Sequence, residues 1–245
     1  ASLRGLPDLG FLGLEEMASA VERMARRISI PLIADGDTGY GGPPEVERCV
    51  RAFEDAGAAG ILLEDQVFPK RCGHFDGNAV IPAAEMVAKL EAALEARRDD
   101  DFVIFARTDA RQSEGIDSAI ERINLYCSAG AEVAFVEAPQ SREEIAEIAA
   151  RVEYPKFANM LSFGKTPLLE AAELEEMGFK FVVAPIETLL VSARAIELLA
   201  ETFLRDGSSE ARKEEMMRFE ELKEVLELEK YLRLREENDS GDAGE

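Results

Sequence analysis

Short apolar runs of four to six residues alternate along the chain with longer segments in which apolar side chains recur every three or four positions. A short run bounded by polar residues or glycine predicts a buried strand, and the longer periodic segments predict amphipathic helices. The predicted strands cover residues 30–34, 60–63, 102–106, 133–136, 156–159 and 179–184. The predicted helices cover residues 14–27, 44–56, 83–96, 116–128, 142–152, 167–177 and 188–205. Repeated strand–helix units indicate an α/β fold with a parallel sheet and helices outside it.

Ionisable and amide side chains follow five successive predicted strands at the point where each strand ends. They are Asp35 and Asp37, Glu64 and Asp65, Arg107 and Asp109, Glu137, and Asn159. Functional groups from many strand ends converge in the (β/α)8 barrel, whereas a doubly wound sheet uses mainly one switch point. The glycine-rich stretch 39–42 does not match the dinucleotide-binding fingerprint. We therefore predict a (β/α)8 TIM barrel.

We expect the first strands of the barrel to be missing from this sequence. Six strand–helix units are visible, whereas a closed barrel has eight, and the chain opens in the loop-like segment 5–10. We expect about two strands and one helix to precede residue 1. We assign residues 1–207 to the catalytic barrel and 208–237 to a C-terminal helical oligomerisation region, because its apolar side chains have no remaining barrel face to cover. Residues 238–245 are predicted to be a disordered polar tail.

Composition excludes several classes of partner. The chain has a formal net charge of −22, so nucleic acid would be repelled. No apolar run approaches the roughly 18 residues that a membrane span needs, and no secretory signal opens the chain. The three cysteines are odd in number and far apart, which favours a reducing cytoplasm over a disulfide framework.

The Asp35-Gly36-Asp37 sequence ends the first predicted strand. Side chains at positions i and i+2 of an extended chain face the same way, so both carboxylates are expected to point at one cation. Glu64 lies on the neighbouring strand, and a site made of oxygen ligands suits Mg²⁺ or Mn²⁺ rather than zinc. Two alternatives stay open: either aspartate can cap the next turn, and an Asp-x-Asp pair also occurs in glycosyltransferases.

The only histidine of the chain, His74, follows Lys70 and Cys72 at intervals of two residues. In an extended loop the three side chains share one face, and nearby cations would lower the pKa of Cys72 and favour its thiolate. Cys72 is then a candidate nucleophile or proton donor. The alternative is a small buried core residue, which is the expected role of Cys49 and Cys127 on predicted helices. A zinc site is not expected, because there is no second histidine and the other cysteines are remote.

Arg107 ends the third predicted strand, and its planar guanidinium suits a substrate carboxylate. The alternative is an ion pair with Glu64 or Glu137, and both roles can hold together. Glu137 and Asn159 fit hydrogen bonds to a substrate or support for the residues that contact it.

Five motifs together resemble the isocitrate lyase/phosphoenolpyruvate mutase superfamily. They are ADGDTGYG at 34–41, LEDQVFPKRCGH at 63–74, ARTDAR at 106–111, FVEAP at 135–139 and ANMLSFGKTP at 158–167. The similarity runs from residue 1 to about residue 235. The KRCGH motif is typical of the carbon–carbon lyase branches, whereas phosphonate-forming mutases and oxaloacetate decarboxylase-like members usually lack its cysteine.

The resemblance implies a barrel that is usually a tetramer of helix-swapped dimers. It implies that Asp35 and Asp37 serve Mg²⁺ (Mn²⁺ being possible), with Glu64 in the outer shell. It implies an active-site loop formed by Lys70, Cys72, Gly73 and His74, and it implies that the catalytic residues are Lys70, Cys72, His74 and Arg107. It implies that Gly73, Arg107, Glu137 and Asn159 surround the substrate. The Ser-Gly segment that holds the oxo acid in this family would precede Ala1.

Two positions depart from the family pattern. Asn78 stands where family lyases usually carry lysine. Leu190 stands where methylisocitrate lyases carry an arginine for an extra carboxylate. The second departure favours a 2-substituted malate over a tricarboxylate, and the sequences at 35–43 and 68–82 are nearest to the dimethylmalate lyase and petal-death-type branch.

The expected activity is Mg²⁺-dependent cleavage of a 2-hydroxy di- or tricarboxylate of the 2-alkylmalate or 2-methylisocitrate type. Retro-Claisen chemistry would give a 2-oxo acid such as pyruvate and a second carboxylic acid. The alternatives are an isocitrate lyase giving glyoxylate and succinate, a phosphoenolpyruvate mutase or oxaloacetate hydrolase-like enzyme, and an inactive homologue kept as an oligomer partner. The intact aspartate, Lys-Cys-His and arginine set favours an enzyme.

Overall fold

The computed structural model describes residues 1–241 and divides into two compact units, Ala1–Glu187 and Thr188–Glu245. The first unit alternates strands and helices. Its strands are β1 (Ile33–Asp35), β2 (Gly60–Glu64), β3 (Val103–Thr108), β4 (Val133–Val136), β5 (Lys156–Asn159) and β6 (Phe179–Val183). Its helices are η1 (Ser2–Arg4), α1 (Leu14–Ala25), α2 (Pro43–Asp55), α3 (Ala83–Ala96), α4 (Ala110–Glu114), α5 (Ile116–Ser128), α6 (Arg142–Arg151) and α7 (Ala171–Glu176).

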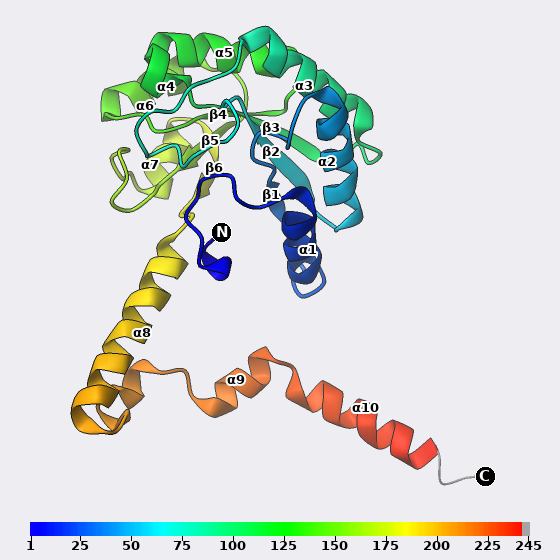
Figure 1. The fold of residues 1–245 in the computed structure, drawn as a ribbon, viewed down its shortest axis with the longest axis vertical. Coiled ribbons are helices and arrows are strands. Elements are labelled where there is room, and N and C mark those ends of the chain that lie inside the picture. Colours follow the sequence, from blue (N-terminus) through cyan, green and yellow to red (C-terminus); the bar gives the residue numbers. More distant parts are fainter. Residues whose placement is uncertain (242–245) are drawn as a thin grey trace. The chain divides into compact units, whose positions relative to one another are not determined.

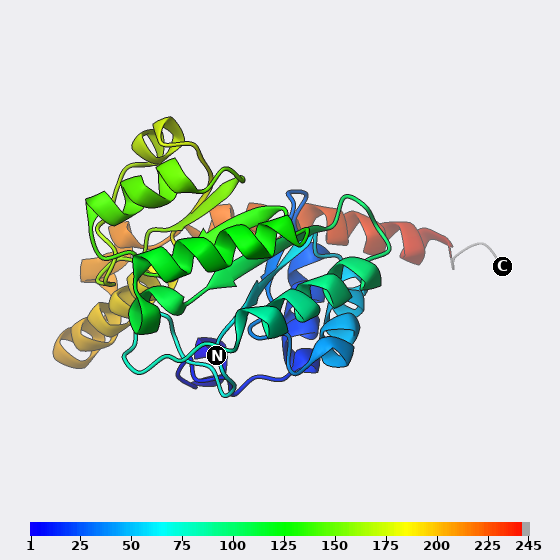
Figure 2. The ribbon, with the colours of Figure 1, turned by 90° about the horizontal axis from the view of Figure 1, so that it is seen from above.

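The six strands form one parallel sheet in the order of the sequence, from β1 to β6. Helices α2, α3, α5 and α6 lie on one face of this sheet (Figure 1). Figure 2 shows α3 and α5 packed side by side across that face. Parallel strands require long crossover connections, and a helix in each connection covers the same face of the sheet.

Both faces of the sheet carry apolar layers. Along β3, Ile104 and Ala106 join the cluster beneath the helices, whereas Phe105 points to the opposite face. There the ring of Phe105 packs edge-on against Phe157 and Phe181, with centroids 6.0 and 5.1 Å away. An apolar layer on the helix-free face is the packing found inside a barrel wall.

The structure corrects the predicted elements in a few places. Strand β1 begins at Ile33 rather than at residue 30, because Pro31 has no N–H to donate to the ladder. Helix α4 was not predicted, since five residues are too short to show helical periodicity. Helix α7 begins at Ala171, after Pro167.

The second unit contains α8 (Glu187–Asp206), η2 (Glu210–Glu215), α9 (Phe219–Val225) and α10 (Leu228–Gly241). The two compact units divide at residue 187, and Thr202 is the one buried residue of α8. The assignment of residues 1–207 to a catalytic barrel and 208–237 to oligomer contacts stays a prediction. Helix α10 includes 238–241 of the predicted tail, and residues 242–245 lie outside the described part of the chain. No helix in residues 1–241 is long and apolar enough to cross a membrane.

Candidate active site

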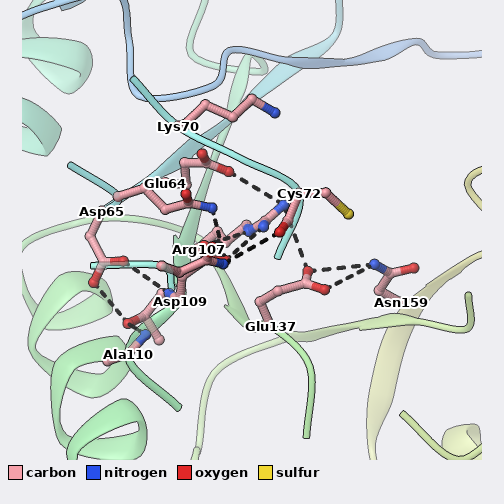
Figure 3. Close-up of polar contacts among 12 residues, drawn as sticks. Glu64, Asp65, Lys70, Cys72, Arg107, Asp109, Ala110, Glu137 and Asn159 are labelled. Carbon is pink, nitrogen blue, oxygen red and sulfur yellow. Dashed lines mark hydrogen bonds and ion pairs between the residues drawn. The ribbon is translucent and has the colours of Figure 1, made fainter. Parts of the chain in front are cut away.

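The carboxyl ends of β2 to β5 bring the predicted polar side chains together. The parallel register pairs Glu64 of β2 directly with Arg107 of β3. Arg107 lies two residues beyond Phe105, so its side chain leaves the same inner face. Figure 3 shows its guanidinium among the carboxylates of Glu64, Asp109 and Glu137.

Arg107 is the central charge of this cluster. Its Nε and Nη2 each donate to Asp109 at 2.8 Å, and its Nη1 lies 3.4 Å from Glu64 and 3.6 Å from Glu137. Both ion pairs left open by the sequence are therefore present. Burial raises the pKa of Glu64 well above its usual value, and it raises the pKa of Asp109 to about 6, each against the pull of Arg107. Three buried carboxylates outnumber the single guanidinium, so this end of the sheet favours a further cation.

Asp109 is held in place by a second buried carboxylate, Asp65. Asp65 accepts hydrogen bonds from the Asp109 backbone N–H at 2.9 Å, and from the hydroxyls of Thr108 and Tyr126 at 2.8 Å each. Sequence reasoning assigned no role to either aspartate. The spacing of Arg107 and Asp109 by two residues was the available signal, since it places both on one face.

The loop of residues 70–78 docks onto this cluster through Gly73. A Cβ atom at Gly73 would lie 2.4 Å from Glu137 Cγ and 2.6 Å from Arg107 Nη2, so this approach requires glycine. His74 Nε2 lies 2.8 Å from Glu137 Oε1, and Asn159 Nδ2 donates to the same oxygen at 3.3 Å. Burial alone would raise the pKa of Glu137, but Arg107 and the hydrogen bond from His74 hold it below its usual value.

Lys70 points away from Cys72 and His74. Its ammonium lies 2.8 Å from Asp8 and 2.7 Å from Asp37. The loop is not extended, because the N–H of Phe75 donates to the carbonyl of Cys72 at 2.9 Å and closes a turn. The prediction that the three side chains share one face was therefore wrong. Asp8 was missed altogether, since a carboxylate in an irregular loop carries no periodic signal.

Cys72 is a half-buried thiol in this loop. Burial raises its pKa; the His74 backbone N–H and Arg107 lower it, and the charges of Asp8 and Glu137 raise it. The expectation of a lowered pKa was therefore wrong, because burial and the two carboxylates outweigh the groups that favour the thiolate. Cys49 and Cys127 are buried in the apolar layer beneath the helices, as their helical positions predicted.

Asp35 and Asp37 do not share one strand face as predicted. Strand β1 ends at Asp35, whose carboxylate accepts the Asp37 N–H at 2.9 Å, and Asp37 lies in the following turn with a φ of 47°. Within residues 1–241, no group of three His, Cys, Asp or Glu side chains lies close enough to hold a metal ion directly.

The charges nevertheless fit Mg²⁺ with water completing its shell. Burial and the neighbouring Asp35 raise the pKa of Asp37 to about 6, and both carboxylate oxygens of Glu64 are buried without a hydrogen-bond partner. Carboxylates that lack donors are the ligands a hard dication prefers, and Mg²⁺ usually keeps several waters.

Several known proteins are similar to this chain over most of its length. The family model described as phosphoenolpyruvate phosphomutase matches residues 1–204. The petal death protein of Dianthus caryophyllus is 41% identical over 94% of this chain and 73% of its own length. The 2,3-dimethylmalate lyase of Eubacterium barkeri is 40% identical over 94% of this chain and 80% of its own. The 2-methylisocitrate lyase of Aeropyrum pernix is 46% identical over 83% of this chain and 65% of its own.

Solved structures give the same result. A crystal structure of 2,3-dimethylmalate lyase has a TM-score of 0.89 and 35% identity, covering 100% of this chain and 80% of that one. Oxaloacetate acetylhydrolase with the inhibitor 3,3-difluorooxalacetate has a TM-score of 0.90 and 34% identity, covering 100% of this chain and 82% of that one. Phosphonopyruvate hydrolase with oxalate and Mg²⁺ has a TM-score of 0.84 and 26% identity, covering 95% of this chain and 81% of that one. The six-stranded sheet is thus a half-barrel of this fold, which confirms the predicted class, and the chain belongs to the PEP mutase/isocitrate lyase superfamily.

Proposed function

We propose that the protein is a carbon–carbon lyase that cleaves a 2-hydroxy dicarboxylate of the 2-alkylmalate type to a 2-oxo acid and a second carboxylic acid. The observation that carries the proposal is the half-buried Cys72, whose pKa is raised by burial, in a loop that docks through Gly73 on the Arg107–Glu137 pair. A thiol that keeps its proton can supply the proton that a carbanion product needs. Lyases of dimethylmalate and methylisocitrate are among the relatives, which supports the same class.

In this mechanism some residues bind the substrate and stabilise negative charge, and Cys72 donates a proton. Arg107 and the Asn159 amide orient the substrate carboxylates and stabilise the charge that develops on them. A base removes the hydroxyl proton, and the C2–C3 bond breaks as the hydroxyl carbon becomes the carbonyl of the oxo acid. The electron pair of that bond stays on the departing carbon, which takes the proton of Cys72. Solvent then returns a proton to the sulfur.

The metal belongs to the same proposal. Asp35 and Asp37 would hold Mg²⁺, with Glu64 behind them, and Mg²⁺ when bound would polarise the oxygens of the oxo acid. Lys70 then has a clear role, because its ammonium balances the excess charge of Asp8 and Asp37.

A panel of acids tests the reaction. Dehydrogenase-coupled assays would follow pyruvate and glyoxylate released from 2,3-dimethylmalate, 2-methylisocitrate and isocitrate, with oxalate from oxaloacetate measured alongside. Pyruvate from the dimethylmalate at the highest kcat/KM supports the proposal. Oxalate as the main product would instead assign the acetylhydrolase reaction. No product from any of these acids would overturn the lyase assignment.

Metal binding should depend on pH. We expect MgCl₂ to raise the melting temperature, by the equivalent of about 2.7 kcal/mol at a hundredfold excess over its dissociation constant. Asp37, with a pKa of about 6, is mostly protonated at pH 5.5, so the affinity should be about fourfold lower there than at pH 7.5. Differential scanning fluorimetry at both pH values measures this.

The matched control for the metal prediction is Asp35→Asn, which should abolish the shift at both pH values. Excess EDTA should also abolish turnover, and MgCl₂ or MnCl₂ should restore it. An equal shift in the parent and in Asp35→Asn would contradict the assignment of these aspartates.

The C-terminal helices should mediate oligomer formation. Large apolar side chains after residue 207 are exposed, among them Phe219 at 70%, Val225 at 61% and Tyr231 at 50%. Such a surface is expected to be covered by another protomer, and by resemblance we propose a homotetramer with swapped helices. Light scattering at micromolar concentration should show a tetramer for the parent and a smaller species for the truncated chain 1–207. A monomeric parent would contradict this prediction.

A further inference from the structure

We propose that Lys165, in the segment between β5 and α7, is a positioning residue that clamps the 70–78 loop over the site and fixes the proton of His74 on Nε2. The first part stands on three contacts with consecutive loop residues. The backbone N–H of Lys165 donates to His74 Nδ1 at 2.9 Å. Its ammonium donates to the Phe75 carbonyl at 3.4 Å and lies 2.7 Å from Asp76 Oδ1.

The contact to His74 determines where the imidazole carries its proton. A backbone N–H can only donate, so Nδ1 accepts and carries no proton in this arrangement. The neutral ring therefore holds its proton on Nε2, which is the nitrogen 2.8 Å from Glu137 Oε1. His74 thus bridges the Lys165 amide and Glu137, the carboxylate next to Arg107.

The segment that carries Lys165 is shaped to meet the ring. A Cβ atom at Gly164 would lie 2.7 Å from His74 Nδ1, so the close approach requires glycine there. Phe163 adopts a φ of 62°, which is costly for a bulky residue and is kept only where the surrounding contacts enforce it. The segment is anchored at its start by the Ser162 N–H, which donates to Glu187 at 2.7 Å.

Asp76 is clamped from a second element as well. Gln112 of α4 donates to the same Asp76 oxygen at 3.2 Å. The Asp76 side chain is 93% exposed and that of Lys165 26%, so the ion pair itself is of the modest surface kind. Its loss should change the balance of closed and open loop by a factor of about 1.5 to 5.

The alkylation of Cys72 measures loop opening without any substrate. Iodoacetamide modification would be followed by peptide mass spectrometry on the intact oligomer, since the thiol lies in the loop and becomes accessible when the loop opens. Lys165→Met and Asp76→Asn should each speed the modification of Cys72 by about 1.5- to 5-fold. The double variant should be slower than the product of the two single effects predicts, because both single variants weaken the same Lys165–Asp76 ion pair. Lys165→Arg should keep the parental rate.

The matched control is Lys213→Met, which loses a similar surface pair with Glu210 in the C-terminal unit and should leave the rate unchanged. Parental rates in both Lys165→Met and Asp76→Asn, or additive effects in the double variant, would overturn the clamp. Because the chain has one histidine, ¹⁵N labelling of histidine gives a single pair of ring signals. A protonated Nε2 and an unprotonated Nδ1 are expected, and a proton on Nδ1 would overturn the second part.

The meaning of the clamp for catalysis rests on the proposed lyase function, but these measurements do not. If no acid on the panel is cleaved, the lyase proposal fails while the alkylation and nitrogen results still decide the clamp. If cleavage is found, Lys165→Met should raise KM by a similar factor to the alkylation rate, since the substrate must then close a looser loop.

Discussion

Cys72→Ser is expected to bind substrate and metal nearly as well as the parent and to lose about 10² to 10⁴ in kcat. A serine hydroxyl fills the same space, but its pKa is far above that of a thiol, so it is a poor proton donor to a carbanion. The structure keeps the sulfur protonated by burial and by the nearby carboxylates of Asp8 and Glu137. Steady-state kinetics on the best acid of the panel, with substrate affinity measured by calorimetry, separates the two effects.

The matched control for this variant is Cys127→Ala, because that thiol lies in the apolar layer far from the loop. Cys49→Ser is a less suitable control, since Cys49 is fully buried and a serine hydroxyl there would lack a partner. Parental kcat in Cys72→Ser would exclude the thiol as proton donor. It would point to mutase or decarboxylase chemistry that needs no thiol.

Most of the fold could be predicted from the sequence because its signals are local. The runs at 133–136 and 156–159 are strands as predicted, and the amphipathic helices at 83–96 and 116–128 have the predicted bounds. Polar residues after successive apolar runs also predicted correctly that functional groups gather at the carboxyl ends of the strands. Errors arose where a single residue overrides the pattern, as Pro31 does in β1.

The partners within the site could be predicted only in part. Glu64 and Arg107 meet because register aligns them, which the strand pattern implies. The Asp37 N–H donates to the Asp35 carboxylate in one turn, and the Phe75 N–H donates to the Cys72 carbonyl in the other; no periodicity reveals either hydrogen bond. An assumption of extended backbone therefore placed the right residues near each other with the wrong orientations.

Lys165 could not have been found from the sequence. It lies about ninety residues from the histidine that it contacts, and the contact to the ring uses its backbone N–H rather than its side chain. A backbone donor is present at nearly every position, so residue type carries no information about it. Closure of the 70–78 loop therefore depends on tertiary contacts between the segment after β2 and the segment after β5.

Arg107→Met is expected to lower the free energy of unfolding by about 3–5 kcal/mol at pH 7.5, the usual cost of removing one partner from buried ion pairs. Glu64 is 0% exposed, and Asp109 and Glu137 are each 2% exposed. Water therefore cannot solvate these carboxylates in place of the guanidinium. Urea denaturation measures the loss. Activity should fall as well, and Arg107→Lys should not restore it, because a lysine cannot reproduce the paired donors that meet Asp109.

The loss in free energy of unfolding caused by Arg107→Met should be smaller at pH 5 than at pH 7.5. Without Arg107 the folded-state pKa values of Glu64 and Asp109 rise further above their unfolded values near 4, and the pKa of Glu137 rises from its lowered value. A carboxyl with a raised folded pKa takes up a proton on folding, so its penalty is absent below the unfolded pKa and grows as pH rises through the folded one. The difference in free energy of unfolding between the parent and Arg107→Met should therefore decrease by about 1 kcal/mol or more from pH 7.5 to pH 5.

Arg151→Met is the control for both effects. That arginine pairs with Asp117 at 2.6 Å on the surface, where its side chain is 40% exposed, so its removal should cost no more than about 1 kcal/mol. The carboxylate it leaves behind remains in water, and its small effect should not narrow at pH 5 in the way expected for Arg107→Met. If Arg107→Met lost as little free energy of unfolding as Arg151→Met at both pH values, the three buried carboxyl groups would have to be neutral already in the parent. Arg107 would then not serve as their counter-charge, and its role in stabilising developing negative charge would lose its structural basis.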